Sequence, residues 1–204
     1  MAELELLDWR RQVAAMYALV RERLAGDPVV AHDDWCTSRD ELFRSHPESP
    51  VDDPGSFAGL QHASYDPSFV WTVAVDTDVE RERLDVGTSD GGGMAFIRFG
   101  RVSLPMGTLD VFWLDAYSGG IFLPFRDATA GDTTYGGGRY LLDTAKGADL
   151  GSHPDGRLTL DFNFAYHPSC YYSPRWSCPL PPPGNTLTEA VPVGEITPQP
   201  GATV

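Results

Sequence analysis

The apolar residues of this chain change their spacing at about residue 57, and that change constrains the fold more than any other feature. Before it, five apolar residues recur three or four positions apart: Leu6, Trp9, Val13, Met16 and Val20. This spacing lines one helical face, so we predict an amphipathic helix over residues 3–25, followed by a stop at Gly26 and Pro28. A short second helix is predicted at 38–45, which begins with the capping-box pattern SRDE.

After residue 57 the apolar residues alternate with polar ones, as they do in a strand with one buried face. The alternation is clear at 69–75 and 95–99, and further strands are predicted at 84–86, 109–114, 121–123, 139–142 and 158–164. They are spaced about a dozen residues apart without helical crossovers, which favours antiparallel pairing. The predicted fold is mainly β: an antiparallel meander of six to eight strands that forms a small barrel or a sandwich, accompanied by the two helices.

The chain divides into four predicted parts. Residues 1–56 form a helical region that packs on the barrel, and residues 57–166 form the antiparallel β domain. Residues 167–195 are rich in proline, tyrosine and cysteine and pack on that domain, because proline cannot donate to a sheet and the aromatic side chains need burial. Residues 196–204 are predicted to be a disordered tail.

The charge of the chain excludes two classes of partner. Lys and Arg number 15 against 29 Asp and Glu, giving a net charge of −14, which disfavours nucleic acid and anionic membranes. Asp is abundant whereas Lys146 is the single lysine. This balance is typical of proteins from salt-accumulating archaea, where dense salt screens the carboxylates. A GC-rich genome, which also replaces Lys with Arg, is the alternative.

The termini and the cysteines indicate the compartment. The acidic N-terminus has no apolar segment behind it, and no run approaches the ~18 apolar residues of a membrane span, so we predict a cytoplasmic protein. Reduced thiols are then expected at Cys36, Cys170 and Cys178. A disulfide between Cys170 and Cys178 is an alternative, as is a metal held with His167, but their spacing is unusual for zinc and we predict no metal site.

Three stretches of the sequence carry a family resemblance. They are GIFLPFRDAT at 120–129, TYGGGRYL at 134–141, and LDFN at 160–163 continued by Tyr166, Pro168, Cys170, YSP at 172–174 and CPLPPP at 178–183. Together they resemble the bacterial and archaeal family called domain of unknown function 1684, and the resemblance spans roughly residues 9–195. It implies no particular chemistry, and no cofactor. His167 departs from the asparagine that the resemblance leads us to expect.

The same stretches concentrate polar residues near glycine-rich strand ends. Arginines at two strand ends could clamp a carboxylate or phosphate, with neutral donors beside them. The candidate ligand-binding residues are Arg126, Tyr135, Arg139, Tyr140, Asn163 and Tyr166. In the alternative, Arg126 pairs internally with Asp127, Arg139 pairs with another acid, and the three glycines at 136–138 form a β-bulge. Asn163 is expected to share one strand face with Asp161.

Three functions remain open at this stage. The first is a module that binds a small anionic molecule at a barrel mouth. The second is a flavin-dependent oxidoreductase of the split-barrel type, and the third is a structural protein that forms a homodimer without a ligand. The cofactor and the catalytic residues stay unknown, because the chain has no P-loop, no HExxH pattern and no nucleophile elbow.

Overall fold

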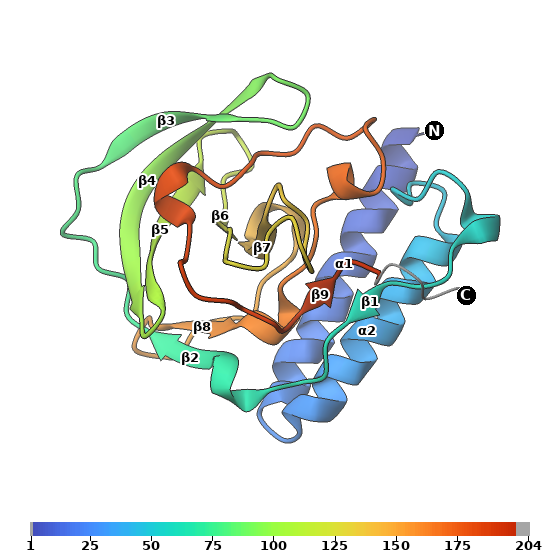
Figure 1. Cartoon of the computed structure of the whole chain (residues 1–204), viewed down its shortest axis with the longest axis horizontal. Helices are drawn as coiled ribbons and strands as arrows, with labels where there is room; N and C mark the ends of the chain where they lie inside the picture. Colours follow the sequence, from blue (N-terminus) through green and yellow to red (C-terminus); the bar gives the residue numbers. More distant parts are fainter. Residues whose placement is uncertain (1, 199–204) are drawn as a thin grey trace.

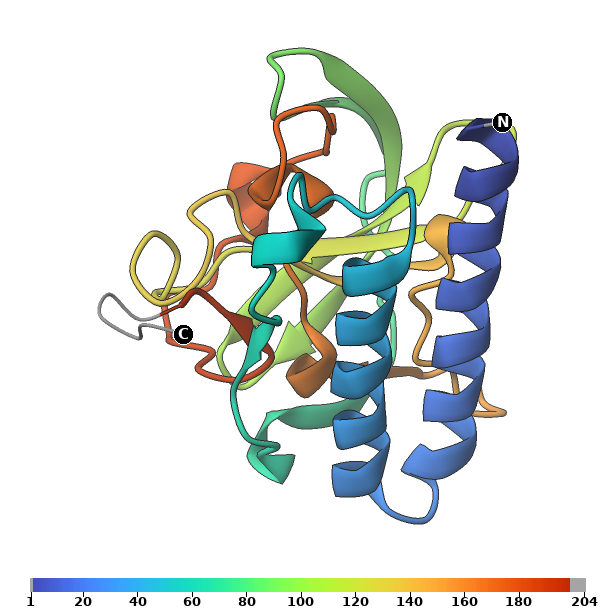
Figure 2. The same ribbon diagram turned by 90° about the vertical axis from the view of Figure 1, so that its right-hand side faces the viewer.

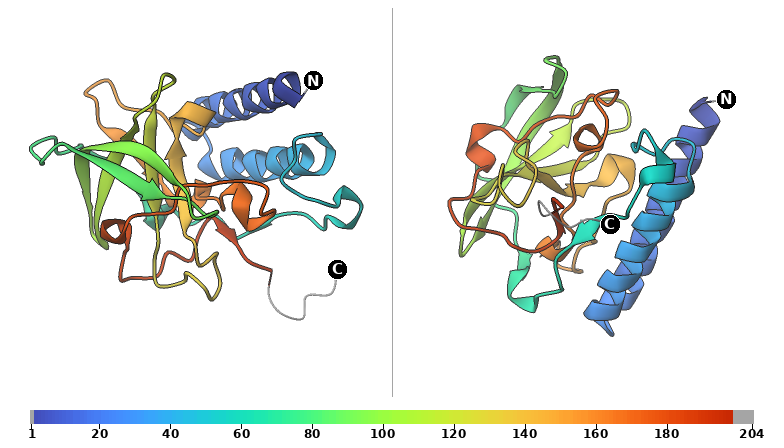
Figure 3. Two further views of the ribbon diagram at one scale, coloured as in Figure 1. Left: turned by 90° about the horizontal axis from the view of Figure 1, so that it is seen from above. Right: turned by 45° about the vertical axis from the view of Figure 1, so that its right-hand side comes forward.

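The computed structural model describes residues 2–198. Two helices, α1 (Ala2–Leu24) and α2 (Pro28–Ser45), lie side by side against one flank of a β-rich body (Figures 1 and 2). Seen from above, the strands lie on one side of the molecule and both helices on the other (Figure 3). Among the described residues, no helix has the length and apolar character needed to cross a membrane.

The central sheet is a five-stranded antiparallel meander. Its strands follow the chain order: β3 (Glu82–Gly87), β4 (Gly93–Leu104), β5 (Gly107–Leu114), β6 (Ile121–Phe125) and β7 (Arg139–Asp143). Two further antiparallel pairs join β2 (Val70–Val73) to β8 (Leu158–Asp161), and β1 (Gln61–His62) to β9 (Glu195–Ile196). The predicted mainly β, antiparallel meander is confirmed. The pairings of residues 2–198 form three sheets and close no barrel.

The first helix is confirmed, whereas the second begins ten residues before the predicted position. Asp27 starts α2 by accepting a hydrogen bond from the Val30 N–H, and Pro28 occupies its first turn. The helix was underestimated because its buried face is partly polar: it carries His32 and Arg39 beside Trp35 and other apolar residues. A search for apolar periodicity passes over such a face.

The last predicted strand, 158–164, is shorter than expected. β8 ends at Asp161, whose carboxylate accepts the Asn163 N–H at 3.0 Å and begins a 3-10 turn over Phe162–Phe164. The prediction that Asp161 and Asn163 share one strand face is therefore wrong, because Asn163 lies in the turn after the strand. The Asn163 side chain instead binds both backbone polar groups of Asp66, which fixes the loop before β2.

The C-terminal part of the chain is fastened to the meander by buried polar groups. Asn185 is fully buried, and its amide binds the backbone of Asp110 in β5 and Pro124 in β6. From Asn185 the chain continues to β9, where Glu195 forms an ion pair with Arg39 of α2. The tail predicted at 196–204 falls mostly outside the described residues, and β9 includes Ile196.

Candidate functional site

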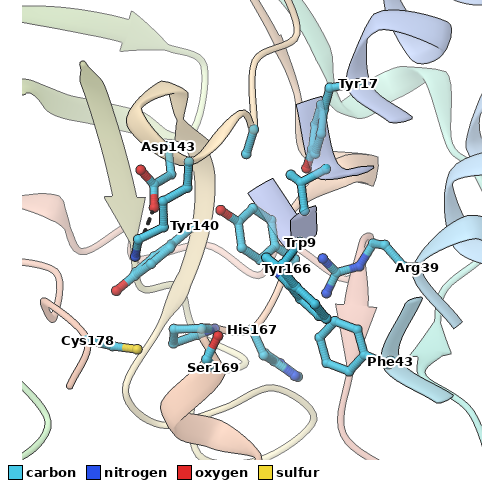
Figure 4. A pocket seen from close by; sticks show the side chains of 14 residues that line it. Trp9, Tyr17, Arg39, Phe43, Tyr140, Asp143, Tyr166, His167, Ser169 and Cys178 are labelled. Atoms are coloured by element: carbon cyan, nitrogen blue, oxygen red, sulfur yellow. Dashed lines mark ion pairs between the residues drawn. The ribbon is translucent and has the colours of Figure 1, made fainter. Parts of the chain in front are cut away.

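A cavity of about 70 Å³ lies between the helices, β7 and the segment that follows β8. Figure 4 shows the side chains that surround it. They come from α1 (Trp9, Val13, Tyr17), α2 (Arg39, Phe43), β7 and the turn after it (Tyr140, Asp143, Lys146, Ala148), and the later chain (Tyr166, His167, Pro168, Ser169, Cys178). The volume suits a few water molecules or a small ligand.

Arg39 is the most unusual residue of this lining. It is 6% exposed, and one guanidinium nitrogen, Nη2, donates to Glu195 Oε2 at 2.9 Å. The guanidinium also lies about 5 Å from the ring centres of Trp35, Phe43 and Tyr166, where the aromatic faces attract its charge. Its Nε has no hydrogen-bond partner among the described residues, so the side chain keeps a spare buried donor.

Glu195 stands behind Arg39 and is 1% exposed. Its Oε2 accepts from the backbone N–H of His167 at 2.9 Å as well as from Arg39. His167 uses Nε2 to accept the Tyr135 N–H at 3.2 Å, which leaves its ring proton on Nδ1, 3.6 Å from Glu195 Oε1. The Nδ1 atom has no hydrogen-bond partner among the described residues, and the basic Nε2 lone pair is already occupied by the Tyr135 N–H, so His167 offers no free general base to the cavity.

Burial controls the charge states of Glu195 and His167. Desolvation raises the pKa of Glu195 to about 7, although the Arg39 charge and the hydrogen bonds oppose the rise. Burial likewise lowers the pKa of His167 to about 3, helped by the charges of Arg139 and Arg39. Near neutral pH, His167 is uncharged and Glu195 is partly protonated. The positive charge of Arg39 is then only partly balanced.

Three tyrosines complete the polar wall of the cavity (Figure 4). Tyr140 and Tyr166 exchange backbone hydrogen bonds of 2.9 and 3.0 Å, which sets their rings 5.8 Å apart. The Tyr140 hydroxyl donates to the Pro179 carbonyl. Tyr17 of α1 is 1% exposed and its hydroxyl makes no hydrogen bond with the described residues. Burial raises the pKa of Tyr17 to about 12, against a smaller opposing effect of Arg39, so it remains a neutral donor.

The remaining charges of the lining are Asp143 and Lys146. The Lys146 Nζ lies 3.4 Å from Asp143 Oδ2, and the lysine side chain is 53% exposed while the aspartate is 9% exposed. Asp143 thus pairs with Lys146, and the two cations Lys146 and Arg39 line the same cavity. This arrangement can hold an anion and orient it with neutral hydroxyls.

The predicted site residues are distributed unevenly around this cavity. Tyr140 and Tyr166 line it, whereas Arg126, Tyr135, Arg139 and Asn163 do not. Ligand binding by the latter four stays a prediction.

Arg139 is fully buried and directs its donors into the chain. It pairs with Asp127 at 2.9 Å and donates to the carbonyls of Val191, Val193 and Glu195. Arg139 is therefore in an internal ion pair, as the alternative predicted, but its partner is Asp127, which the alternative had assigned to Arg126. Arg126 does not pair with Asp127; it donates to the carbonyls of Gly136 and Pro181.

The triple glycine allows close packing rather than a bulge. A Cβ at Gly137 would lie 2.2 Å from the Tyr135 ring, and one at Gly138 would lie 2.7 Å from the Phe125 carbonyl. The register shift of this hairpin falls instead at Leu123 and Pro124 of β6. The glycines thus let Pro181 and the Phe125 carbonyl approach the backbone closely.

Sequence reasoning missed Arg39, Glu195, Tyr17 and Lys146. Two of them carried a usable signal: Lys146 is the only lysine, and Glu195 is a lone charge within the run VPVGEI. A single charge among apolar residues often marks a buried pair. Arg39 and Tyr17 gave no such signal, because both sit in helices rich in other polar residues.

The three thiols are free, and the described residues contain no group of His, Cys, Asp and Glu side chains that could hold a metal. Cys178 lies in the wall of the cavity, while Cys170 lies beside it in the 3-10 turn Ser169–Tyr171.

Two comparisons place the chain among known proteins. Residues 55–196 match the family described as protein of unknown function (DUF1684). The solution NMR structure of an uncharacterised protein from Haloarcula marismortui is similar, with 34% identity, a TM-score of 0.55, and coverage of 79% of this chain and 90% of that one. A search of curated proteins finds no match. Because the family match extends from the end of the helical region to β9, this protein belongs to the DUF1684 family.

Proposed function

We propose that this protein binds a small anion, such as a short carboxylate, in the cavity between α1, α2 and β7. One observation carries the proposal: Arg39 is more than nine-tenths buried, lines the cavity and keeps an Nε–H without a partner among the described residues. A buried donor left unpaired costs about 1–3 kcal/mol, so an acceptor in the cavity would stabilise the protein.

The size of the cavity favours a small ligand over a flavin. Sites for drug-sized ligands enclose about 300–1,000 Å³, whereas this cavity measures about 70 Å³. Arg139, one of two arginines expected to clamp a phosphate, already donates from both terminal nitrogens to Asp127 and backbone carbonyls. The flavin-dependent oxidoreductase and the ligand-free dimer are therefore alternatives that the same experiments must distinguish.

Native mass spectrometry of freshly purified protein separates these three classes. A co-purifying mass that matches a small organic acid supports the proposal. The mass of a flavin would contradict the proposal and favour the flavin-dependent oxidoreductase. A ligand-free dimer would contradict it and favour the structural role.

Calorimetric titration then tests the site directly. Acetate, succinate and inorganic phosphate are added to the protein at one fixed KCl concentration. We expect saturable heat for at least one anion, and a several-fold loss of affinity in Lys146→Met because half of the cationic wall is removed. Arg157→Met is the matched control, since Arg157 is 47% exposed, pairs with Asp155 and does not line the cavity. Equal losses in both variants, or no saturable heat with any probe, would overturn the proposal.

The pH dependence of binding follows from Glu195. Its pKa is raised to about 7, so below that pH the group is protonated and the Arg39 charge is free to attract an anion. Affinity should fall several-fold as the pH rises from about 6 to about 8. Glu195→Gln keeps the neutral form at every pH and should remove this fall. A profile that is the same in both proteins would show that Glu195 does not control the site.

A further inference from the structure

Cys170 and Cys178 are brought together by a short loop. The backbone N–H of Cys170 donates to Cys178 Sγ at 3.3 Å. Cys178 is held against the hairpin after β3 by two hydrogen bonds with Ser89, one from the Cys178 N–H to the hydroxyl and one from the Ser89 N–H to the Cys178 carbonyl. The segment that carries Cys178 is thus fixed by the β body rather than left on a free loop, and Cys170 is held against it.

The two thiols differ in exposure and in their surroundings. Cys178 is 3% exposed, whereas Cys170 is only half-buried. Polar interaction with the Cys178 side chain, and then with those of Ser89 and Tyr135, lowers the pKa of Cys170 to about 6 against the effect of burial. The interaction between the two cysteines, together with burial, raises the pKa of Cys178. Cys170 is the accessible thiolate and Cys178 the protonated partner behind it.

We propose that Cys170 and Cys178 form a thiol–disulfide exchange site whose substrates are disulfides of small thiols. In the first step the Cys170 thiolate attacks one sulfur of the substrate, the substrate S–S bond breaks, and one small thiolate leaves. In the second step Cys178 loses its proton to solvent and attacks the Cys170 sulfur, which releases the second small thiolate. The two protein thiols become one disulfide, and the substrate disulfide becomes two thiols.

Cys36 provides an internal control within the same chain. It is also partly buried, and it contacts the His32 ring with its sulfur 3.6 Å from Nε2, but burial raises its pKa to about 12. In native wild-type protein at about pH 7, iodoacetamide should therefore label Cys170 more than about tenfold faster than Cys36. This measurement needs no variant, so it remains decisive even where a cysteine substitution prevents folding. Equal labelling rates would overturn the proposal.

Oxidised glutathione tests the exchange itself. After incubation of the wild-type chain, the peptides that contain Cys170 and Cys178 should be bridged and lighter by two hydrogen atoms. Cys178→Ser should instead trap one glutathione on Cys170, and Cys170→Ser should carry neither product. A glutathione adduct that persists on Cys170 of the wild type would show that Cys178 does not resolve it, and an absence of any product on either cysteine would exclude the site.

Discussion

Arg139 has no exposed surface, and its guanidinium holds the last part of the chain against β7. It binds the Asp127 carboxylate and the carbonyls of three residues between 191 and 195. Arg139→Met would leave that carboxylate buried without its cation, and we expect a loss of about 3–5 kcal/mol in the free energy of unfolding. Arg157→Met, which breaks an exposed ion pair, should cost under about 1 kcal/mol. Urea unfolding at fixed KCl measures both, and equal losses would show that Arg139 has no fastening role.

At the scale of single residues, the sequence identified unusual side chains better than it identified their partners. Arg139, Asp127 and Asn163 stood out by type and position, and all three form buried polar contacts. The contacts that the sequence hid lie far along the chain: Arg139 donates to the carbonyl of Val191, 52 positions later, and the Arg39–Glu195 pair joins residues 156 positions apart. Such a pair depends on tertiary packing, which no local pattern encodes.

Among the elements, the turn into β7 depends on Gly138. Its φ is +89°, and a Cβ there would lie 2.6 Å from Pro181 Cγ and 2.7 Å from the Phe125 carbonyl oxygen. Gly91 has a similar φ of +83° but open space around it. Gly91→Ala should therefore cost about 1 kcal/mol through backbone strain alone, and Gly138→Ala more than about 2 kcal/mol because packing is lost as well. If both variants unfold at the same urea concentration, packing at Gly138 is unimportant.

The elements themselves were predicted according to how regular their apolar spacing is. The strands of the meander are short apolar segments, some of them alternating, bounded by glycine-rich turns, so the sequence located all five. The early start of α2 was missed because His32 and Arg39 interrupt its buried face, and the end of β8 because Asp161 caps a new turn. In α2 polar side chains are buried, and at Asp161 a polar side chain ends the strand by capping a turn. The spacing of apolar residues reveals neither event.

For the whole molecule, the excess of acidic groups dominates the electrostatics. A net charge of −14 on 204 residues repels itself at low salt. At about 1 M salt the Debye length is about 3 Å, so most of this repulsion is screened. The similar protein from Haloarcula marismortui comes from a halophile. If the acidic groups of this chain are an adaptation to salt rather than the result of a GC-rich genome, its stability must depend on salt.

We therefore predict that the melting temperature rises by roughly 5–10 °C between low and multimolar KCl, as relief of a few kcal/mol of repulsion would produce in a chain of this size. A charge-reduced variant provides the matched comparison, with four exposed acids neutralised: Glu22→Gln, Asp52→Asn, Asp78→Asn and Glu189→Gln. It should melt higher than the wild type at low salt and respond less to KCl, because less repulsion remains to be screened.

A wild-type melting temperature that does not change with KCl would contradict the interpretation of the acidic groups as an adaptation to salt. A rise that is identical in both proteins would assign the effect to the salt's action on hydrophobic burial, which does not depend on surface charge.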